Sequence, residues 1–432
     1  MRSSLPKVLH PLAGRPMVRH VIEAARGAGF ASCVAVVGAE ADAVRAAAGE
    51  AVAFVIQEQP LGTGHAVMQA RGAAGQSEHL LVLNGDVPLI TPETLLQLTR
   101  AHLEQDADLT FLTAQAPEAE EYGLVERDAD GRVVGLVEAA DRSGAAEGPA
   151  EINSGQYCFR ASWLWPHLET LQKSTSGEYY LTTLVSTAVS ENAALLAVRA
   201  DDADEVRGIN DRVQLAEAEA ALRQRINRRH MIAGVTLVDP ATAYIDADVS
   251  IGQDTVIEPN TQLMGATTIG RECRVGPDTT LRDSTLGERC TVVASTIEET
   301  TLEDDCDVGP YSHLRPGTYL ESGVHIGNYA EIKNARLRRG VKMGHFSYIG
   351  DADVGEETNI GAGTITCNFD GTAKHRTVIG KRVFIGSDSK LVAPLTIGDD
   401  ARTGAGSVVT KDVPEGALAV GAPARVMRGD QS

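Results

Sequence analysis

The sequence has few aromatic residues, no paired cysteine motif and no long apolar run. Phe, Tyr and Trp make up only 4% of its 432 residues, so the core must be built from smaller side chains such as Val, Ile, Leu and Ala. No apolar run approaches the roughly 20 residues of a membrane-spanning helix, and no signal peptide opens the chain. The six cysteines are scattered without a CxxC pair, which argues against a disulfide framework or a zinc site and favours a cytoplasmic protein.

Positive charge is also scarce. Lys and Arg number 39 against 59 Asp and Glu, which gives a formal net charge of −20. A surface this acidic repels nucleic acids and anionic membranes, so we expect neither as a partner. If the substrates are anions, positive charge must be concentrated locally in a cleft. The length favours two domains, and the apolar share of 43% is ample for globular folding.

Residues 1–211 alternate between helical and strand patterns. Residues 16–25 carry apolar side chains at helical spacing. The apolar runs at 33–37 and 80–83 predict buried strands, and residues 52–56 predict a further strand. This alternation predicts an α/β domain with a mostly parallel sheet. Residues 212–232 then predict a single helical linker.

Residues 233–432 have a different period, because apolar residues recur at every sixth position. This period fits a parallel β-helix, in which each hexapeptide forms one short strand and one corner of a three-sided prism. We expect glycine to follow the apolar residue because glycine tolerates positive φ at a corner. A β-sandwich is the alternative, but it requires alternation with a period of two. The inward positions are Ile251, Ile257, Leu263, Ile269, Val275, Leu281, Leu302, Val308, Leu314, Leu320, Ile326, Ile332, Ile379, Ile385, Leu391 and Ile397.

A coil of about 18 residues turns sequence spacing into geometry. Arg315 and Lys333 are 18 positions apart and should stack on one face. Two neighbouring cations repel each other unless an anion lies between them, and a sugar phosphate suits that place. The alternative is that both are ordinary solvated charges. Ser387 and Ala405 share the same spacing and can form a column of small residues along which a pantetheine arm lies.

His345 follows Lys333 by 12 positions, and its pKa range suits a general base for acyl transfer to an amine. A single histidine of this kind is otherwise an ordinary surface residue. The stretch 366–376 breaks the repeat, and a loop ejected from a regular solenoid is often functional.

In the first domain, Asp86 follows the predicted strand at 80–83 after Asn84 and Gly85. Ligands of α/β sheets bind at the carboxyl ends of strands, where an Asp can hold Mg²⁺ against phosphates, although it can also cap the next turn. Residues 57–65 follow another strand, and their glycines permit close approach of a ligand to the backbone. Lys7 can neutralise a phosphate, although a lone lysine is usually only solvated.

Several motifs together resemble the bacterial GlmU family, in which glucosamine-1-phosphate N-acetyltransferase is joined to N-acetylglucosamine-1-phosphate uridylyltransferase. They are Leu-Arg-Pro-Gly at 314–317, Gly-His at 344–345, Gly-Ala-Gly-Thr at 361–364 and Thr-Cys-Asn-Phe-Asp-Gly at 366–371. The resemblance implies a left-handed β-helix, a homotrimer with the acetyltransferase site between subunits, and synthesis of UDP-N-acetylglucosamine for peptidoglycan and lipopolysaccharide-type precursors.

The resemblance also implies roles for individual residues. In the acetyltransferase, His345 would be the base, and the backbone N–H of Ala362 is a candidate oxyanion donor. Phe369 stands where the family often has Tyr, so a hydroxyl contact is absent there. The implied ligands of the sugar phosphate are Arg315, Lys333, Tyr348 and Asn359, and the implied contacts of acetyl-CoA are Ala362, Asn368, Phe369, Ser387 and Ala405.

In the uridylyltransferase, Asp86 and Asn210 would hold Mg²⁺, and Lys7 would meet phosphate. The sugar phosphate would attack the α-phosphorus of UTP and release pyrophosphate. The implied uracil contacts are Gln57, Gly62 and Thr63, the implied sugar contacts are Gly123, Glu138 and Asn153, and Asn84 and Gly85 complete the substrate-binding set.

One departure concerns the start of the chain. The family opens with a strand and a glycine-rich loop that cradles the triphosphate, whereas this sequence begins about where that loop would end. We therefore expect weak uridylyl transfer and intact acetyl transfer from the chain as written. Equal UTP turnover by a chain extended upstream would contradict this expectation.

Two other functions stay open. The chain could be a sugar-phosphate adenylyltransferase relative whose β-helix only regulates or oligomerises, but His345 and the ejected loop argue against that. It could also be a non-catalytic trimeric scaffold. Consumption of acetyl-CoA with glucosamine-1-phosphate separates the first alternative from the bifunctional enzyme, and loss of acetylation in His345→Ala would exclude the second.

Overall fold

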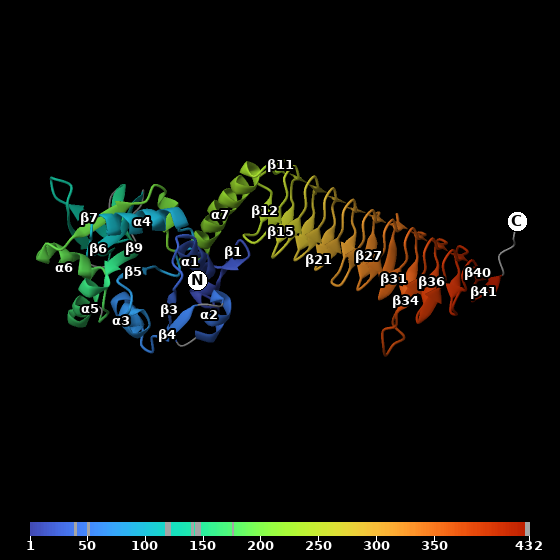
Figure 1. Cartoon of the computed structure of the whole chain (residues 1–432), viewed down its shortest axis with the longest axis horizontal. Helices are drawn as coiled ribbons and strands as arrows, with labels where there is room; N and C mark the ends of the chain where they lie inside the picture. Colours follow the sequence, from blue (N-terminus) through green and yellow to red (C-terminus); the bar gives the residue numbers. More distant parts are fainter. Residues whose placement is uncertain are drawn as a thin grey trace. The chain divides into compact units, whose positions relative to one another are not determined.

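A computed structural model of the chain describes residues 1–38, 41–49, 52–116, 122–139, 142, 148–174 and 177–427. It divides into two compact units, Met1–Leu222 and Arg223–Ser432 (Figure 1). The boundary between them falls within helix α7 (Arg212–Ile232). None of the described helices combines the length and apolar character that a membrane crossing requires.

The first unit alternates strands with helices, as the sequence pattern predicts. Each helix packs its apolar face against a sheet and returns the chain to the next strand. The elements that position the candidate site are α1 (Met17–Gly27), β3 (Val34–Val37), α2 (Ala41–Ala48), β4 (Ala53–Ile56), α3 (Thr63–Ala74), β5 (His79–Val82), α4 (Pro92–Glu104), β6 (Leu109–Ala116), β7 (Leu124–Arg127), β8 (Val133–Val137), β9 (Ala150–Arg160), α5 (Ala161–Thr170), α6 (Thr183–Glu191) and β10 (Leu195–Arg199); the short strands β1 (Pro11–Leu12) and β2 (Arg15–Pro16) form a hairpin.

Strand β9 organises the larger sheet of this unit. It pairs antiparallel with β5, β6 and β7, and β10 pairs parallel with β6. Strands β5, β6, β7 and β10 therefore share one direction, and β9 and β8 run against them. Phe111, Tyr157 and Phe159 on β6 and β9 are almost fully buried and form the centre of the core.

Two strands are less buried than their apolar sequences predict. In β3 only Val37 is buried, and all four residues of β5 are half-buried. The pairing explains the difference: among the described residues, β3 pairs only with β4 and β5 only with β9. Each strand therefore has one unpaired edge among the described residues, and the expectation that both strands are buried is wrong.

The second unit is a parallel β-helix with three faces. Face 1 contains β11 (Thr236–Leu237), β14 (Val256–Ile257), β17 (Arg274–Val275), β20 (Thr291–Val292), β23 (Asp307–Val308), β26 (His325–Ile326), β29 (Lys342–Met343), β32 (Asn359–Ile360), β35 (Phe384–Ile385), β38 (Arg402–Thr403), β40 (Leu418–Gly421) and β41 (Ala424–Met427). Face 2 contains β12 (Tyr244–Ile245), β15 (Gln262–Met264), β18 (Thr280–Arg282), β21 (Thr296–Glu298), β24 (His313–Leu314), β27 (Ala330–Lys333), β30 (Ser347–Gly350), β33 (Ile365–Cys367), β36 (Lys390–Val392) and β39 (Val408–Val409). Face 3 contains β13 (Ser250–Ile251), β16 (Thr268–Ile269), β19 (Thr285–Leu286), β22 (Thr301–Leu302), β25 (Tyr319–Leu320), β28 (Arg336–Leu337), β31 (Ala352–Val354), β34 (Thr377–Ile379) and β37 (Leu395–Ile397).

The six-residue period places its apolar residues inside the prism, which confirms the β-helix. Leu263, Leu314 and Ile332 are fully buried, and of the predicted inward positions only Ile251 is half-buried. The slips in the pattern have a structural cause. Thr268 pairs with Thr285 and Thr285 with Thr301, so these coils contain 17 and 16 residues.

The glycines that follow inward residues have a different role from the one expected. Only one of the eight glycines that follow these apolar residues, Gly309, has a positive φ. The eight are Gly252, Gly270, Gly309, Gly327, Gly350, Gly361, Gly386 and Gly398. A Cβ at Gly252 would instead lie 2.6 Å from the backbone of Gly270 in the next coil. Glycine is needed here because the stacked backbones approach closely, and the positive φ angles fall at corner residues such as Asp254 and Asn260.

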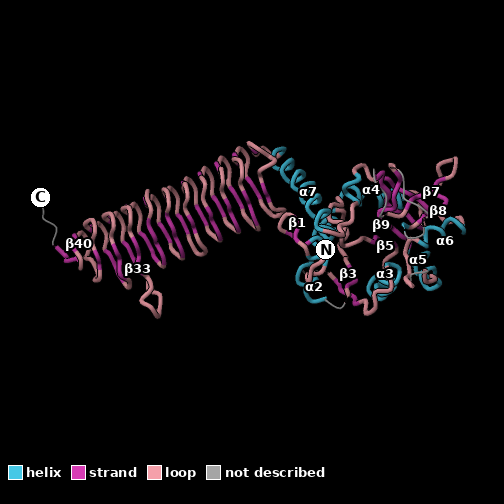
Figure 2. The backbone as a smooth tube through the Cα atoms, turned by 180° about the vertical axis from the view of Figure 1, so that it is seen from behind, coloured by secondary structure: helices cyan, strands magenta, loops and turns pink. Residues whose placement is uncertain are grey.

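One coil is much longer than the others. Asn359 pairs with Phe384, twenty-five positions later, so extra residues leave the prism between β33 and β34. Figure 2 shows this segment protruding from the stacked strands beside β33. The ejected loop that the sequence predicts is therefore present, and we call residues 368–375 the hairpin.

Candidate active sites

A column of small residues follows the corner between face 1 and face 2. Lys342 pairs with Asn359, Ile360 with Ile385 and Phe384 with Arg402. Three positions after Lys342, Asn359, Phe384 and Arg402, the four consecutive coils carry His345, Ala362, Ser387 and Ala405. Backbone hydrogen bonds of 2.6 Å from Asp388 N to Ala362 O and 2.8 Å from Gly406 N to Ser387 O hold the coils together.

His345 lies at the exposed start of this column. In the described part of the chain, no side chain hydrogen-bonds to its imidazole, and no backbone carbonyl accepts the N–H of Ala362 in the next coil. A free imidazole and a free N–H are thus on neighbouring coils of the same corner. This pair can take a proton and stabilise a developing oxyanion.

The cations lie at the opposite edge of face 2. Leu314 pairs with Ile332, and Arg315 N donates to Ile332 O at 2.8 Å, so Arg315 and Lys333 share one corner as their spacing predicts. Arg315 also forms an ion pair with Glu331 at 2.7 Å. The positive charges of Lys374 and Arg315 lower the pKa of the Lys333 ammonium.

Lys374 was not predicted from the sequence. It belongs to the hairpin, where it forms an isolated bridge with Phe369. The 18-residue period cannot locate it because the hairpin lies outside the repeat. Its proximity to Lys333 adds a third positive charge to the corner.

The residues predicted to bind the sugar phosphate do not all meet within one chain. Tyr348 stands in the middle of face 2, and its hydroxyl lies 3.4 Å from Asn368 Nδ2. Asn359 stands on face 1, around the corner from Tyr348 and from the cations. A single protomer therefore presents this set on two faces of the prism.

The hairpin is internally ordered. Asp370 Oδ1 accepts hydrogen bonds of 2.8 Å from the backbone N–H groups of Thr372 and Ala373, and these bonds lower the pKa of Asp370. Asp370 Oδ2 contacts His375 Nε2 at 2.6 Å. Asn368 is buried at the base, whereas Phe369 is 59% exposed. The hairpin thus presents an aromatic ring from a rigid support.

In the first unit, three predicted residues meet around one point. Lys7 Nζ lies 2.5 Å from Asp86 Oδ2 and 2.8 Å from Asn210 Oδ1. Asp86 and Asn210 are joined through the backbone, because Ile209 N donates to Asp86 O at 3.0 Å. The Lys7 ammonium group thus lies between Asp86 Oδ2 and Asn210 Oδ1, where these two oxygen atoms can hold a cation. A carboxylate and an amide oxygen suit a hard divalent ion, which usually keeps several waters or phosphate oxygens.

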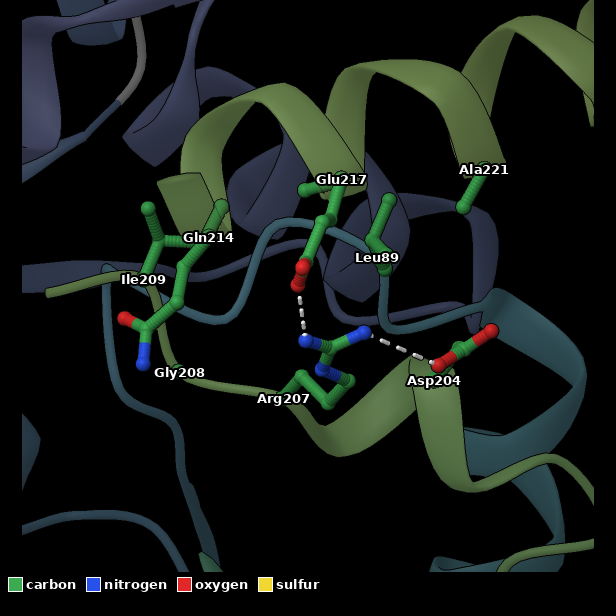
Figure 3. Close-up of a pocket in the computed structure, with 9 residues that line it drawn as sticks. Leu89, Asp204, Arg207, Gly208, Ile209, Gln214, Glu217 and Ala221 are labelled. Carbon is green, nitrogen blue, oxygen red and sulfur yellow. Dashed lines mark hydrogen bonds and ion pairs between the residues drawn. The ribbon is translucent and has the colours of Figure 1, made fainter. Parts of the chain in front are cut away.

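A small pocket is lined by Gly208 and Ile209, which precede Asn210, and by Arg207, Gln214 and Glu217, which the sequence did not indicate (Figure 3). Gln214 Oε1 accepts a hydrogen bond of 2.6 Å from Asn210 N. Arg207 bridges Asp204 and Glu217, which ties the segment before Asn210 to α7. Among the described residues, no group of three or more His, Cys, Asp or Glu side chains is placed to hold a metal ion.

The predicted sugar contacts of this unit also come together. Asn153 N donates to Gly123 O at 2.8 Å, and a Cβ at Gly123 would lie 3.4 Å from Glu138 Oε2. Asn153 is 8% exposed and donates through Nδ2 to the Tyr157 hydroxyl at 2.7 Å. Gly123 thus leaves the Glu138 carboxylate accessible from one side.

The loop after β4 holds the predicted uracil contacts. Gln57 Nε2 donates to Gly62 O at 3.2 Å and lies 2.9 Å from Nδ1 of His65, a residue that the sequence did not single out. Gly62 has φ +99°, and a Cβ there would lie 2.7 Å from Tyr179 O. Thr63 Oγ1 accepts a hydrogen bond from Leu181 N at 3.1 Å.

Asn84 and Gly85 lie in the segment that leads to Asp86. The Asn84 side chain packs against Gly155 on β9, where a Cβ would collide with it. A Cβ at Gly85 would meet only Val8 and Val18, at 3.5 Å and 3.8 Å. The segment therefore links the Asp86 region to the strand that carries Asn153.

Comparisons with known proteins agree with both halves of this description. Residues 1–191 match the model of the MobA-like NTP transferase domain, and residues 248–283 and 376–411 match the bacterial transferase hexapeptide model. The chain is 47% identical to "Bifunctional protein GlmU" of Pelobacter propionicus over 434 aligned positions, which cover 99% of this chain and 94% of the relative. The protein of the same name from Syntrophomonas wolfei is 44% identical, with 97% and 94% covered. That from Trichlorobacter lovleyi is 47% identical, with 97% and 92% covered.

The two folded units, their separate clusters of polar residues and this similarity along nearly the whole length have one explanation. The chain belongs to the GlmU family of bifunctional transferases, which couple acetylation of glucosamine-1-phosphate to uridylyl transfer and so make UDP-N-acetylglucosamine.

Proposed function

We propose that the β-helix unit catalyses acetyl transfer along face 2, with His345 as general base. The observation that carries this proposal is the shared column of His345, Ala362, Ser387 and Ala405, which runs opposite the cationic corner of Arg315 and Lys333. The column is open and lined with small side chains, as a pantetheine arm requires. The cationic corner suits the phosphate of the acceptor sugar.

The residues divide the chemistry between them. His345 takes a proton from the 2-amino group as its nitrogen attacks the thioester carbonyl, and the coenzyme leaves as its thiol. The N–H of Ala362 stabilises the oxygen of the tetrahedral intermediate. Asn368, Phe369, Ser387 and Ala405 contact acetyl-CoA. Phe369 does so through its ring alone.

The sugar phosphate lies among three cations in this proposal. Arg315, Lys333 and Lys374 repel one another without an anion, as the lowered pKa of Lys333 indicates. Tyr348 and Asn359 complete the set. Lys374 extends the site beyond the residues that the repeat indicates.

We further propose a homotrimer. Asn359 and the cations lie on different faces of the same prism, so one sugar cannot contact both sets within a single chain. A second copy whose face 1 approaches face 2 of the first would bring Asn359 to the cations. This arrangement makes the site a feature of the assembly.

An acetyl-CoA consumption assay with glucosamine-1-phosphate tests the acetyltransferase. Activity in the wild type and its loss in His345→Ala support the proposal. A wild type that consumes no acetyl-CoA would favour the scaffold or the adenylyltransferase relative. A mixture of Asn359→Ala and Lys333→Ala chains, each inactive alone, should regain part of the activity if the site lies between subunits.

The first unit catalyses uridylyl transfer at the end of β5. Nucleotidyl transfer of this class uses a divalent metal, and we propose Mg²⁺ held by Asp86 and Asn210. When bound, the ion would supply positive charge to the phosphates of UTP. Lys7 adds a further positive charge. Gly123, Glu138 and Asn153 hold N-acetylglucosamine-1-phosphate, whose phosphate oxygen attacks the α-phosphorus in line and displaces pyrophosphate.

Uracil recognition is proposed for Gln57, Gly62 and Thr63, with Asn84 and Gly85 shaping the approach to Asp86. Pyrophosphate release from UTP and N-acetylglucosamine-1-phosphate tests this unit. Substitution of ATP for UTP is the specificity control, because an adenylyltransferase relative would prefer ATP. The six free cysteines and the acidic surface support a cytoplasmic enzyme with only small-molecule substrates.

A further inference from the structure

Asp351 occupies the corner between face 2 and face 3, one position after the column that contains Arg315 and Lys333. Lys333 pairs with Gly350, so Asn334 and Asp351 stand at the same corner of successive coils. Tyr348 pairs with Ile365, which puts Asn368 at that corner in the next coil. Asp351 therefore lies between the coil that carries Lys333 and the base of the hairpin.

The carboxylate of Asp351 binds both of these neighbours. Asn334 Nδ2 donates to Oδ1 at 2.6 Å, and Asn368 Nδ2 donates to Oδ2 at 2.5 Å. The backbone of Asp351 contributes as well, because Thr377 N donates to Asp351 O at 3.1 Å. One residue thus holds the side chain that begins the hairpin and the backbone that follows it.

Because the hairpin is internally ordered, fixing its base fixes its other residues. His375 N donates to Asn368 O at 2.7 Å, and the Asp370 carboxylate caps the turn. The anchor at Asp351 then helps to set Phe369 and Lys374 relative to Tyr348 and Lys333, together with the contact of 3.4 Å between Asn368 Nδ2 and the Tyr348 hydroxyl. Without the anchor, the hairpin could tilt away from the coil below.

We propose that Asp351 is a positioning residue for acetyl transfer, which fixes the hairpin that contacts acetyl-CoA against the coil that holds the sugar phosphate. This inference rests on the proposed function of the β-helix unit. Asp351 itself contacts neither substrate. It sets the separation between the acyl donor and the amine, on which the rate of a two-substrate reaction depends strongly.

The variant Asp351→Asn tests this inference with little change in shape. The φ of Asp351 is +49°, a region that Asn also tolerates. An amide offers one acceptor oxygen where the carboxylate offers two, so one of the two Asn donors loses its partner. We expect the KM for acetyl-CoA to rise roughly tenfold, as the loss of a hydrogen bond to a charged acceptor predicts.

The KM for glucosamine-1-phosphate should stay within about twofold or fall, because removal of a negative charge beside Lys333 does not weaken phosphate binding. A general loss of folding would instead lower the apparent kcat and leave both KM values unchanged, because it only reduces the fraction of active enzyme. Asp283→Asn is the matched control. Asp283 stands at the same corner of an earlier coil with φ +47°, and its carboxylate accepts a hydrogen bond from Ala266 N at 2.9 Å.

Amide hydrogen exchange gives a second readout that needs no substrate. The N–H groups of Asn368 and Thr377 bond to Thr366 O and Asp351 O at the base of the hairpin. Their exchange should be faster in Asp351→Asn and unchanged in Asp283→Asn. A variant with wild-type KM for acetyl-CoA and wild-type exchange in the hairpin would overturn the inference. Inactivity of the wild type with both substrates would instead overturn the proposed function, so the two failures are distinct.

Discussion

The two units bring functional residues together by different means. In the β-helix, the partners are one coil apart, as with Arg315 and Lys333 or His345 and Ala362. In the first unit, Lys7 and Asn210 are 203 positions apart and meet through the packing of strand ends and α7. In a repeat, the separation of two residues along the sequence predicts how close they lie in space. In an α/β fold, that prediction is possible only once the topology is known.

The largest expected effect follows from this separation of the units. His345→Ala should lower acetyl transfer by roughly 10²–10⁴-fold, the usual contribution of a general base. Uridylyl transfer from the same preparation should not change, because His345 belongs to the other unit. Thioester consumption and pyrophosphate release, measured in parallel, check both statements. Equal losses of both activities would indicate misfolding or a shared site.

Metal removal should have the opposite selectivity. Chelation with EDTA should abolish pyrophosphate release and leave acetyl transfer within about twofold of its starting rate. The reason is that Asp86 and Asn210 offer oxygen ligands, whereas the His345 corner uses a proton acceptor and a backbone N–H. Asp86→Asn should reproduce the effect of EDTA at normal Mg²⁺ concentration. Acetyl transfer that also required added metal would contradict this division.

Much of the β-helix site could be predicted because its positions follow the period. The steps from His345 to Ala362, from Ser387 to Ala405 and from Arg315 to Lys333 each span 17 or 18 residues, whereas the step from Ala362 to Ser387 spans 25 because the hairpin is inserted there. Lys374 and Asp351 could not be predicted in this way. Lys374 lies in the hairpin, outside the period, and the role of Asp351 depends on where the hairpin begins.

The first unit could be predicted only in part. Asp86 was found because it follows an apolar strand, but its link to Asn210 through Ile209 and Gln214 depends on tertiary packing. The half-exposure of β3 and β5 was missed because sequence pattern reports apolar content and not which edges are paired. The glycines of the β-helix were located correctly and explained wrongly, since contact between coils cannot be read from one coil.

The role of these glycines can be measured. Gly270→Ala would put a Cβ against the backbone of Gly287 and should reduce the free energy of unfolding by about 3 kcal/mol, because backbone cannot move aside as a side chain can. Gly323→Ala is the matched control, since Gly323 has φ +71° and open space around it. It should cost only about 1 kcal/mol. Chemical denaturation that follows the unfolding of the β-helix gives both values. A larger loss in Gly323→Ala than in Gly270→Ala would favour positive φ at a corner as the reason for these glycines.

The smallest predicted effect concerns acid stability of the first unit. His102 is fully buried, with Nδ1 2.9 Å from Thr110 Oγ1 and Nε2 3.0 Å from His79 Nδ1. Burial, helped by the nearby His79 and Arg160, lowers the pKa of His102 to about 4. The unfolded chain therefore binds this proton more readily than the folded one, and stability falls as the pH drops from about 6.5 towards 4.

Between pH 7 and pH 5, this histidine should cost up to about 2 kcal/mol in the free energy of unfolding. His102→Gln keeps an amide that can bond to Thr110 and His79 but does not titrate. The variant should start less stable at pH 7, because its packing is poorer, and lose less on acidification. Urea denaturation of both proteins at the two pH values measures the difference. An equal loss in the variant would assign the acid sensitivity to other groups, whereas a smaller loss would show that a buried histidine gives the α/β unit a pH dependence of its own.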